Sequence, residues 1–85
     1  MVTKKITIKI PTGLEARPVA LLVQVASRYE SSVFVECEDK KVNAKSIMGM
    51  MSLGIAAGEE VTVTANGKDE EEAIENIEKY LSSKE

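Results

Sequence analysis

The sequence predicts an α+β fold in which helices pack on one face of a single sheet. Three observations support this fold class. Several runs alternate apolar and polar residues with a period of two, which is typical of half-buried strands. Other segments repeat apolar residues every three or four positions, as a helix with one buried face does. A polar turn at Asp39-Lys40 separates two short strand-like runs, which indicates an antiparallel hairpin.

The first strand and the first helix are predicted as follows. Val2, Ile6, Ile8 and Ile10 alternate with polar residues, and Pro11 ends the run. A threonine and a glycine then predict a turn. A helix is expected to follow up to Tyr29, with a proline in its first turn, where a missing amide costs no hydrogen bond. Its buried face is predicted to contain Leu22, Val25, Ala26 and Tyr29.

A hairpin, a third long strand and a final helix complete the chain. The hairpin pairs a strand over residues 33–37, in which Cys37 is expected to fill core, with a short return strand at Lys41-Val42. Alternation over residues 61–66 predicts the next long strand. Asp69 and Glu72 have the spacing of a capping box at the start of the last helix. That helix has an apolar stripe of Ala73, Ile74, Ile77 and Leu81. The predicted order is β-α-β-β-α-β-α.

Size and composition limit the classes of function. A chain of 85 residues is expected to form one domain over residues 1–85. No apolar run approaches the roughly 18 residues of a membrane span, and a single cysteine allows no internal disulfide, so we expect a cytoplasmic protein without membrane contact. The net charge of −3 and the lack of a basic stripe argue against direct nucleic-acid binding. The chain has no histidine, which excludes histidine chemistry. We expect no metal, no cofactor and no catalytic residue.

The segment NAKSIMGMMSL, residues 43–53, is the most informative stretch. Ser46 stands where a helix N-cap would, directly after the basic Lys45. Ile47, Met48 and Met51 follow at spacings of three and four, so they crowd one helical face. The sequence therefore predicts a soft apolar docking surface with a modifiable hydroxyl at one end. The alternative is a capped helix of the core.

Two motifs resemble those of the HPr family, the phosphocarriers of the sugar phosphotransferase system. TGLEARP, residues 12–18, resembles the active-site loop, and KSIMGMMSL, residues 45–53, resembles the regulatory serine segment. Their separation, the chain length and the element order also match, so the resemblance covers the entire chain. It implies an open-faced two-layer sandwich of a four-stranded, mainly antiparallel sheet and three helices, in a single HPr-like domain.

One departure from the family changes the expected function. Glu15 stands where the family has its phosphoryl-accepting histidine, and Arg17, which helps to hold the phosphate in the family, is retained. This pattern resembles the Crh-like paralogues of carbon catabolite repression. The resemblance implies that HPr kinase/phosphorylase phosphorylates Ser46 and that the modified chain is a corepressor partner of catabolite control protein A, not an enzyme. The partner-binding residues are expected to be Arg17, Ala20, Leu21, Gln24, Lys45, Ile47, Met48 and Met51.

Alternatives remain open at Glu15 and in assembly. The carboxylate is a non-catalytic substitute, a mimic of a phosphohistidine or, in a phosphocarrier, the acceptor of an acyl phosphate. A further alternative is an HPr in which a natural or introduced replacement has removed histidine phosphotransfer. The sequence is compatible with a monomer or a dimer, the latter by exchange of the first strand.

Overall fold

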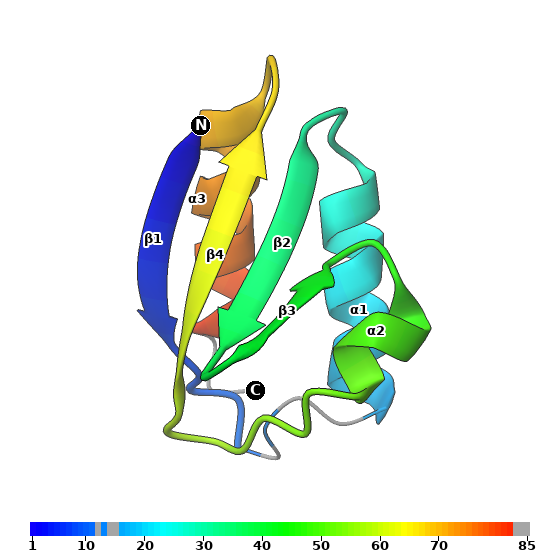
Figure 1. Cartoon of the computed structure of the whole chain (residues 1–85), viewed down its shortest axis with the longest axis vertical. Coiled ribbons are helices and arrows are strands. Elements are labelled where there is room, and N and C mark those ends of the chain that lie inside the picture. Colours follow the sequence, from blue (N-terminus) through cyan, green and yellow to red (C-terminus); the bar gives the residue numbers. More distant parts are fainter. Residues whose placement is uncertain (12, 14–15, 83–85) are drawn as a thin grey trace.

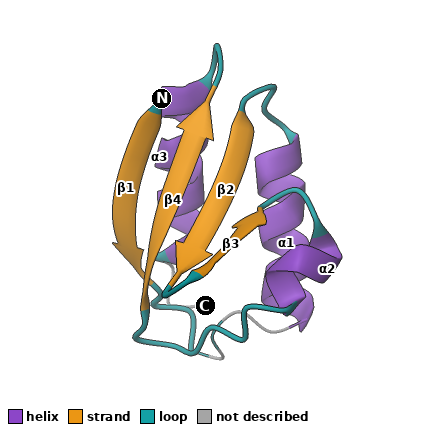
Figure 2. Cartoon of the chain, viewed as in Figure 1, coloured by secondary structure: helices purple, strands orange, loops and turns teal. Residues whose placement is uncertain are grey.

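The computed structural model describes residues 1–11, 13 and 16–82 of the chain. Within these residues, four strands form one antiparallel sheet in the order β1-β4-β2-β3. Of the helices, α1 and α3 cover one face of this sheet, while α2 lies beside α1 near the end of β3 (Figures 1 and 2). The predicted fold class and element order are confirmed. The elements are β1 (Val2–Thr7), α1 (Ala16–Ser27), β2 (Ser32–Cys37), β3 (Lys40–Asn43), α2 (Ile47–Met51), β4 (Glu60–Asn66) and α3 (Glu70–Leu81).

The predicted alternation places one set of strand side chains in a single core. In β4, Val61, Val63 and Ala65 are buried, whereas Thr62 and Thr64 lie on the opposite and more exposed face. β4 pairs with β1 on one side and with β2 on the other, so its buried face lies near the middle of the sheet. The core therefore lies between the sheet and the pair formed by α1 and α3, and the other face of the sheet stays open.

β1 is shorter than the alternating run that predicted it. The strand ends at Thr7, although Ile8 and Ile10 are as buried as a strand residue of the inner face. The Ile8 amide still donates to the Glu59 carbonyl at 2.8 Å, but the Lys9 amide donates to the carbonyl of Leu81 at the end of α3, at 2.9 Å, so the backbone turns away from β4 there. The side chains thus keep their period of two after the strand has ended.

The hairpin between β2 and β3 turns one residue earlier than the predicted Asp39-Lys40 turn. Glu38 has a positive φ of 56°, and Lys40 is already paired with Cys37 in the ladder. Tight two-residue hairpin turns require such left-handed residues, so Glu38 takes the position despite the steric cost of its Cβ.

α1 has the predicted start, but its buried face is displaced toward Val19 and Val23, which are both buried. It spans Ala16–Ser27 with the proline in its first turn, and Leu22 and Ala26 are fully buried. Val25 and Tyr29 are only partly buried. Tyr29 lies beyond the end of the helix, and its amide donates to the Ala26 carbonyl at 3.2 Å in a tighter final turn. The stripe of α3, in contrast, is buried throughout as predicted.

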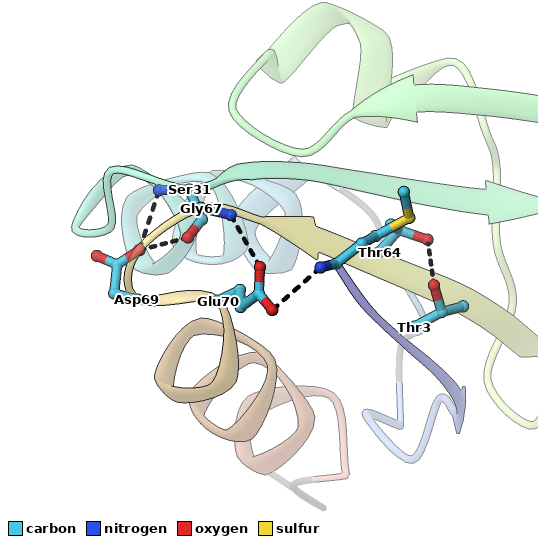
Figure 3. Close-up of polar contacts among 7 residues, drawn as sticks. Thr3, Ser31, Thr64, Gly67, Asp69 and Glu70 are labelled. Atoms are coloured by element: carbon cyan, nitrogen blue, oxygen red, sulfur yellow. Dashed lines mark hydrogen bonds and ion pairs between the residues drawn. The ribbon is translucent and has the colours of Figure 1, made fainter.

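Asp69 is the N-cap residue of α3, as predicted, but the predicted capping box with Glu72 is wrong. The Asp69 side chain makes no hydrogen bond to its own helix. Its carboxylate instead accepts hydrogen bonds from the backbone amide and the hydroxyl of Ser31 (Figure 3). It also accepts the Glu30 amide, and both amide contacts measure 3.0 Å. Glu70, rather than Glu72, reaches back along the chain and accepts the Gly67 amide at 3.0 Å.

The reason for this difference is the loop that precedes β2. Ser31 is fully buried, and buried polar groups need hydrogen-bond partners. The turn before α3 approaches this loop so closely that a Cβ on Gly67 would lie 2.7 Å from the Ser31 Cα. Asp69 is therefore in reach of Ser31 and joins two loops that are far apart in the sequence.

We expect the Asp69 contacts to make folding stability fall in acid. The Ser31 hydroxyl, followed by the Glu30 amide, holds the pKa of Asp69 below its usual value of 3.8. The folded state therefore binds this proton more weakly than the unfolded chain. The stability gained above pH 3.8 is lost as the pH falls through the lower folded-state value. Urea unfolding between about pH 7 and about pH 2 measures this loss.

The variant Asp69→Asn removes the titrating group, so its free energy of unfolding should decline less in acid than that of the unmodified protein. Glu71→Gln, which changes an exposed carboxylate in the first turn of the same helix, is the matched control. Its free energy of unfolding should decline in acid as much as that of the unmodified protein. Equal acid losses in the Asp69→Asn variant and in the unmodified protein would contradict the assignment.

Candidate functional site

Ser46 caps the short helix α2, as the sequence predicted. Its backbone is extended, with φ −108° and ψ 115°, and its Oγ accepts the Gly49 amide at 3.1 Å. The Ser46 carbonyl accepts the Met50 amide at 3.0 Å, which is the first helical hydrogen bond. Because Ser46 is only partly buried, a reagent can approach this residue from solvent.

The apolar side chains of α2 divide between two environments. Met50 is fully buried and belongs to the core. Ile47, Met48 and Met51 expose 47%, 84% and 52% of their surfaces. The predicted exposed face of α2 is confirmed, and the alternative of a core helix describes Met50 only.

The predicted residues of α1 share one helical face beside α2. Arg17, Ala20, Leu21 and Gln24 are spaced by three, one and three positions, which places them along one side of the helix. Ala20 is partly buried and the other three are exposed. α1 and α2 are in contact and lie side by side (Figure 1).

The exposed apolar side chains of these two helices form what we call the docking patch. It contains Leu21, Ile47, Met48 and Met51. Within the described part of the chain, Met1 is the one other exposed large apolar residue. Exposed apolar groups that gather on neighbouring elements mark interaction surfaces more often than scattered ones do.

Lys45 has a structural contact that the sequence did not reveal. Its side chain is partly buried, and its Nζ donates a hydrogen bond to the Tyr29 carbonyl at 2.7 Å. Tyr29 follows the end of α1, where unpaired carbonyls favour a nearby cation. Lys45 therefore ties the start of α2 to the end of α1, in addition to its expected part in partner binding.

The loop that carries the TGLEARP motif, residues 12–18, is only partly described. Glu15, the residue at the phosphocarrier position, lies outside the described residues. Gly13 is buried with φ 70°, and a Cβ there would lie 2.7 Å from the Ile55 carbonyl oxygen and 2.9 Å from the Ala57 amide. Only glycine fits this position without strain, because the backbone is left-handed and another segment crosses it closely.

Two further features of the described residues bear on ligands and membranes. Residues 1–11, 13 and 16–82 contain no group of three or more histidine, cysteine, aspartate or glutamate side chains placed to hold a metal ion. In the same ranges, no helix is long and apolar enough to cross a bilayer. The site that the structure does present is a capping hydroxyl beside an exposed apolar surface.

A comparison with known families identifies the family to which this fold belongs. The family model described as "PTS HPr component phosphorylation site" matches residues 2–83. The chain belongs to the HPr family. The surface formed by α1 and α2 is therefore part of an HPr domain. The family resemblance inferred from the two motifs is confirmed.

Individual relatives include both Crh and HPr proteins. The HPr-like protein Crh of Bacillus subtilis (strain 168) is 54% identical, over 95% of this chain and 95% of its own. A crystal structure of HPr from Thermoanaerobacter tengcongensis superposes with a TM-score of 0.93 and 53% identity, covering 98% of this chain and 93% of that one. Identity therefore supports an HPr-like regulatory or phosphocarrier role without separating the two.

A crystal structure of Bacillus subtilis Crh bears on assembly. It is 52% identical, covers 100% of this chain and 98% of that one, and superposes with a TM-score of 0.79. It is described as a dimer with a swapping domain. HPr-like chains with this level of identity can thus form dimers.

The difference in burial between Met50 and Met48 predicts different losses of stability when each is shortened to alanine. Met50→Ala should lower the free energy of unfolding by about 2–5 kcal/mol, because it leaves a cavity in the core. Met48→Ala should change it by less than about 0.5 kcal/mol, because the side chain is mostly in solvent. Urea unfolding of the two variants measures both values. Similar losses in the two variants would mean that α2 does not use Met50 as its anchor.

Proposed function

We propose that this chain is a Crh-like regulator of carbon catabolite repression. HPr kinase/phosphorylase phosphorylates Ser46, and the modified protein then binds catabolite control protein A as a corepressor in the cytoplasm. One observation carries the proposal: a chain without histidine keeps a capping, partly exposed serine directly beside an exposed apolar surface. The protein's role is binding rather than catalysis.

The docking patch is suited to a contact that becomes stable only when a further interaction is added. Burying an aliphatic or methionine side chain fully contributes roughly 1.5–3 kcal/mol, and the patch residues are already partly covered, so each contributes less. Association costs on the order of 4–15 kcal/mol. The free energy gained from the apolar contact alone is therefore about equal to the free-energy cost of association. A phosphate that forms about one to three charge-assisted hydrogen bonds with a partner would make the complex stable.

The position of Ser46 lets the domain accept this phosphate without unfolding. A phosphoserine carries about −1.5 to −2 charges near pH 7. A negative group at a helix start is favoured by roughly 0.3–1 kcal/mol, since the first amides point toward it. In this chain the Gly49 amide already points at the Ser46 Oγ. The modification therefore changes the partner-facing surface and leaves the core as it is.

The residues in and around the docking patch have complementary roles in this proposal. Arg17 and Gln24 are exposed on the same side of α1 as Leu21 and provide polar groups for the rim of the contact. Ala20, which is small and partly buried, allows a partner side chain to approach α1 closely. Methionines suit a surface of this kind because their flexible thioethers adapt to the shape of a partner.

Phosphorylation should increase the affinity for the repressor by tenfold or more. Each charge-assisted hydrogen bond contributes about 1.5–3 kcal/mol, and about 1.4 kcal/mol corresponds to a factor of ten. The experiment treats the purified chain with HPr kinase/phosphorylase and ATP, locates the phosphate by mass spectrometry, and measures the Kd for catabolite control protein A by calorimetry.

Ser46→Ala should abolish both the modification and the gain in affinity. Ser52→Ala is the matched control, because Ser52 is an exposed hydroxyl at the other end of the same helix, where its Oγ donates to the Gly49 carbonyl at 2.6 Å. It should be phosphorylated and bind like the unmodified sequence. Equal affinities of the phosphorylated and unphosphorylated chain would overturn the proposal.

A phosphocarrier role is the second candidate, and a specific observation favours it. The matching family is described by its phosphorylation site, and an HPr structure shares 53% identity with this chain. In that role Glu15 would have to accept the phosphoryl group. A carboxylate forms an acyl phosphate instead of a phosphoramidate, so the relay chemistry would differ from that of the histidine-bearing members.

We expect no phosphoryl transfer from enzyme I and phosphoenolpyruvate to the unmodified chain. Glu15→His should restore acceptance, because it returns the imidazole that the relay uses, whereas Glu15→Gln should remain inactive. Radiolabel transfer measures this directly. Efficient labelling of the unmodified chain, lost in Glu15→Gln, would favour the phosphocarrier role.

A further inference from the structure

The sulfur atoms of the chain differ sharply in their exposure. All of them lie in the described residues, and the list is Met1, Cys37, Met48, Met50 and Met51. Met48 exposes 84% of its surface and Met51 exposes 52%, whereas Met50 is fully buried between them in the sequence. Two thioethers on one short helix are therefore accessible to solvent, and the third is shielded by the core.

The thiol of Cys37 has a low reactivity toward an oxidant. Burial, followed by the charges of Glu59 and Glu38, raises the pKa of its thiol above the ordinary value. The thiolate is the reactive form of cysteine, so this environment lowers its reactivity. Met1 is exposed, but it precedes β1, outside the docking patch. Met48 and Met51 are thus the accessible sulfur atoms whose oxidation would change the docking patch.

We propose that Met48 and Met51 are sites of reversible oxidation by hydroperoxides, and that sulfoxide formation there opposes docking of the partner. The inference rests on the proposed function of the patch and adds a second input to it. Phosphate on Ser46 adds polar contacts to the complex, whereas oxidation removes apolar ones from the same helix.

The chemistry requires only a hydroperoxide and, for reversal, a thiol reductant. A lone pair of the methionine sulfur attacks one peroxide oxygen, an S–O bond forms and the O–O bond breaks. The departing oxygen takes the proton of the transferred oxygen, directly or through water, and leaves as water, or as an alcohol from an organic hydroperoxide. The sulfur loses two electrons and the peroxide gains them. Methionine sulfoxide reductases return the thioether and convert two thiols to a disulfide with release of water.

The physical effect falls on the interface and spares the fold. A sulfoxide is polar and carries a strong hydrogen-bond acceptor, so it resists burial against apolar partner atoms. Loss of one well-buried methionine contact corresponds to roughly tenfold or more in Kd. The core is unaffected because Met50, the only methionine of α2 that lies in it, is protected.

The experiment treats the Ser46-phosphorylated chain with hydrogen peroxide and maps oxidised positions by peptide mass spectrometry over time. Met48 should oxidise fastest in α2, Met51 next and Met50 slowest. The oxidised chain should bind catabolite control protein A about tenfold more weakly or worse, with an unchanged circular dichroism spectrum. Methionine sulfoxide reductase with a dithiol should restore the affinity.

The variant Met48→Leu/Met51→Leu tests the assignment, because leucine is of similar volume and does not oxidise. Its Met1 and Cys37 remain, so peroxide should cause no further loss from whatever affinity the variant has. A peroxide effect of normal size in this variant would overturn the inference. Oxidation of Met50 as fast as Met48, or full binding by the doubly oxidised chain, would do the same.

The outcomes also separate this inference from the proposed function. If the reduced, phosphorylated chain fails to bind the repressor, the proposed function fails, and the regulatory part of the inference fails with it. The order of oxidation is decided by mass spectrometry in either case. If the reduced form binds and the oxidised form binds equally well, the proposed function stands and oxidative control is refuted.

Discussion

A helix of five residues has too few internal hydrogen bonds to persist by itself, so α2 depends on the contacts that hold it in place. Met50 is buried in the core, the Ser46 hydroxyl caps the first turn, and Lys45 binds the carbonyl of Tyr29 after α1. The docking patch is shared between α1 and α2. Its shape therefore depends on these three contacts rather than on helix propensity.

This arrangement separates the residues that hold α2 from those that a partner meets. Met50 faces the core, whereas Met48 and Met51 face solvent, although all three lie within one turn of the same helix. Chemical changes on the outer side, such as a phosphate or a sulfoxide, can therefore alter binding while the folding free energy stays nearly constant. A regulator needs this independence, because a modification that also unfolded the domain would remove the protein.

Local pattern predicted the fold well because most of its contacts follow from period and polarity. The alternation of β4 and the stripe of α3 each identify one buried face, and the cap at Ser46 is a contact over three residues. Pattern failed where distant segments meet. Asp69 bonds a loop 38 residues away, and no local rule reveals that partner. In so short a helix every apolar residue has another three or four positions away, so spacing did not identify Met50 as the anchor.

The strand order has a consequence for how copies of this protein meet. β1 and β3 are the edges of the sheet, and each carries adjacent lysines, Lys4-Lys5 on one and Lys40-Lys41 on the other. Charged edge strands discourage the edge-to-edge pairing that leads to aggregation. Lys4 is paired with Glu78, but the exposed Lys5, Lys40 and Lys41 leave positive charge on both edges, so pairing of one edge with the edge of a second copy is disfavoured. Contacts that hold two copies together are then more favourable on the side of the molecule formed by the helices.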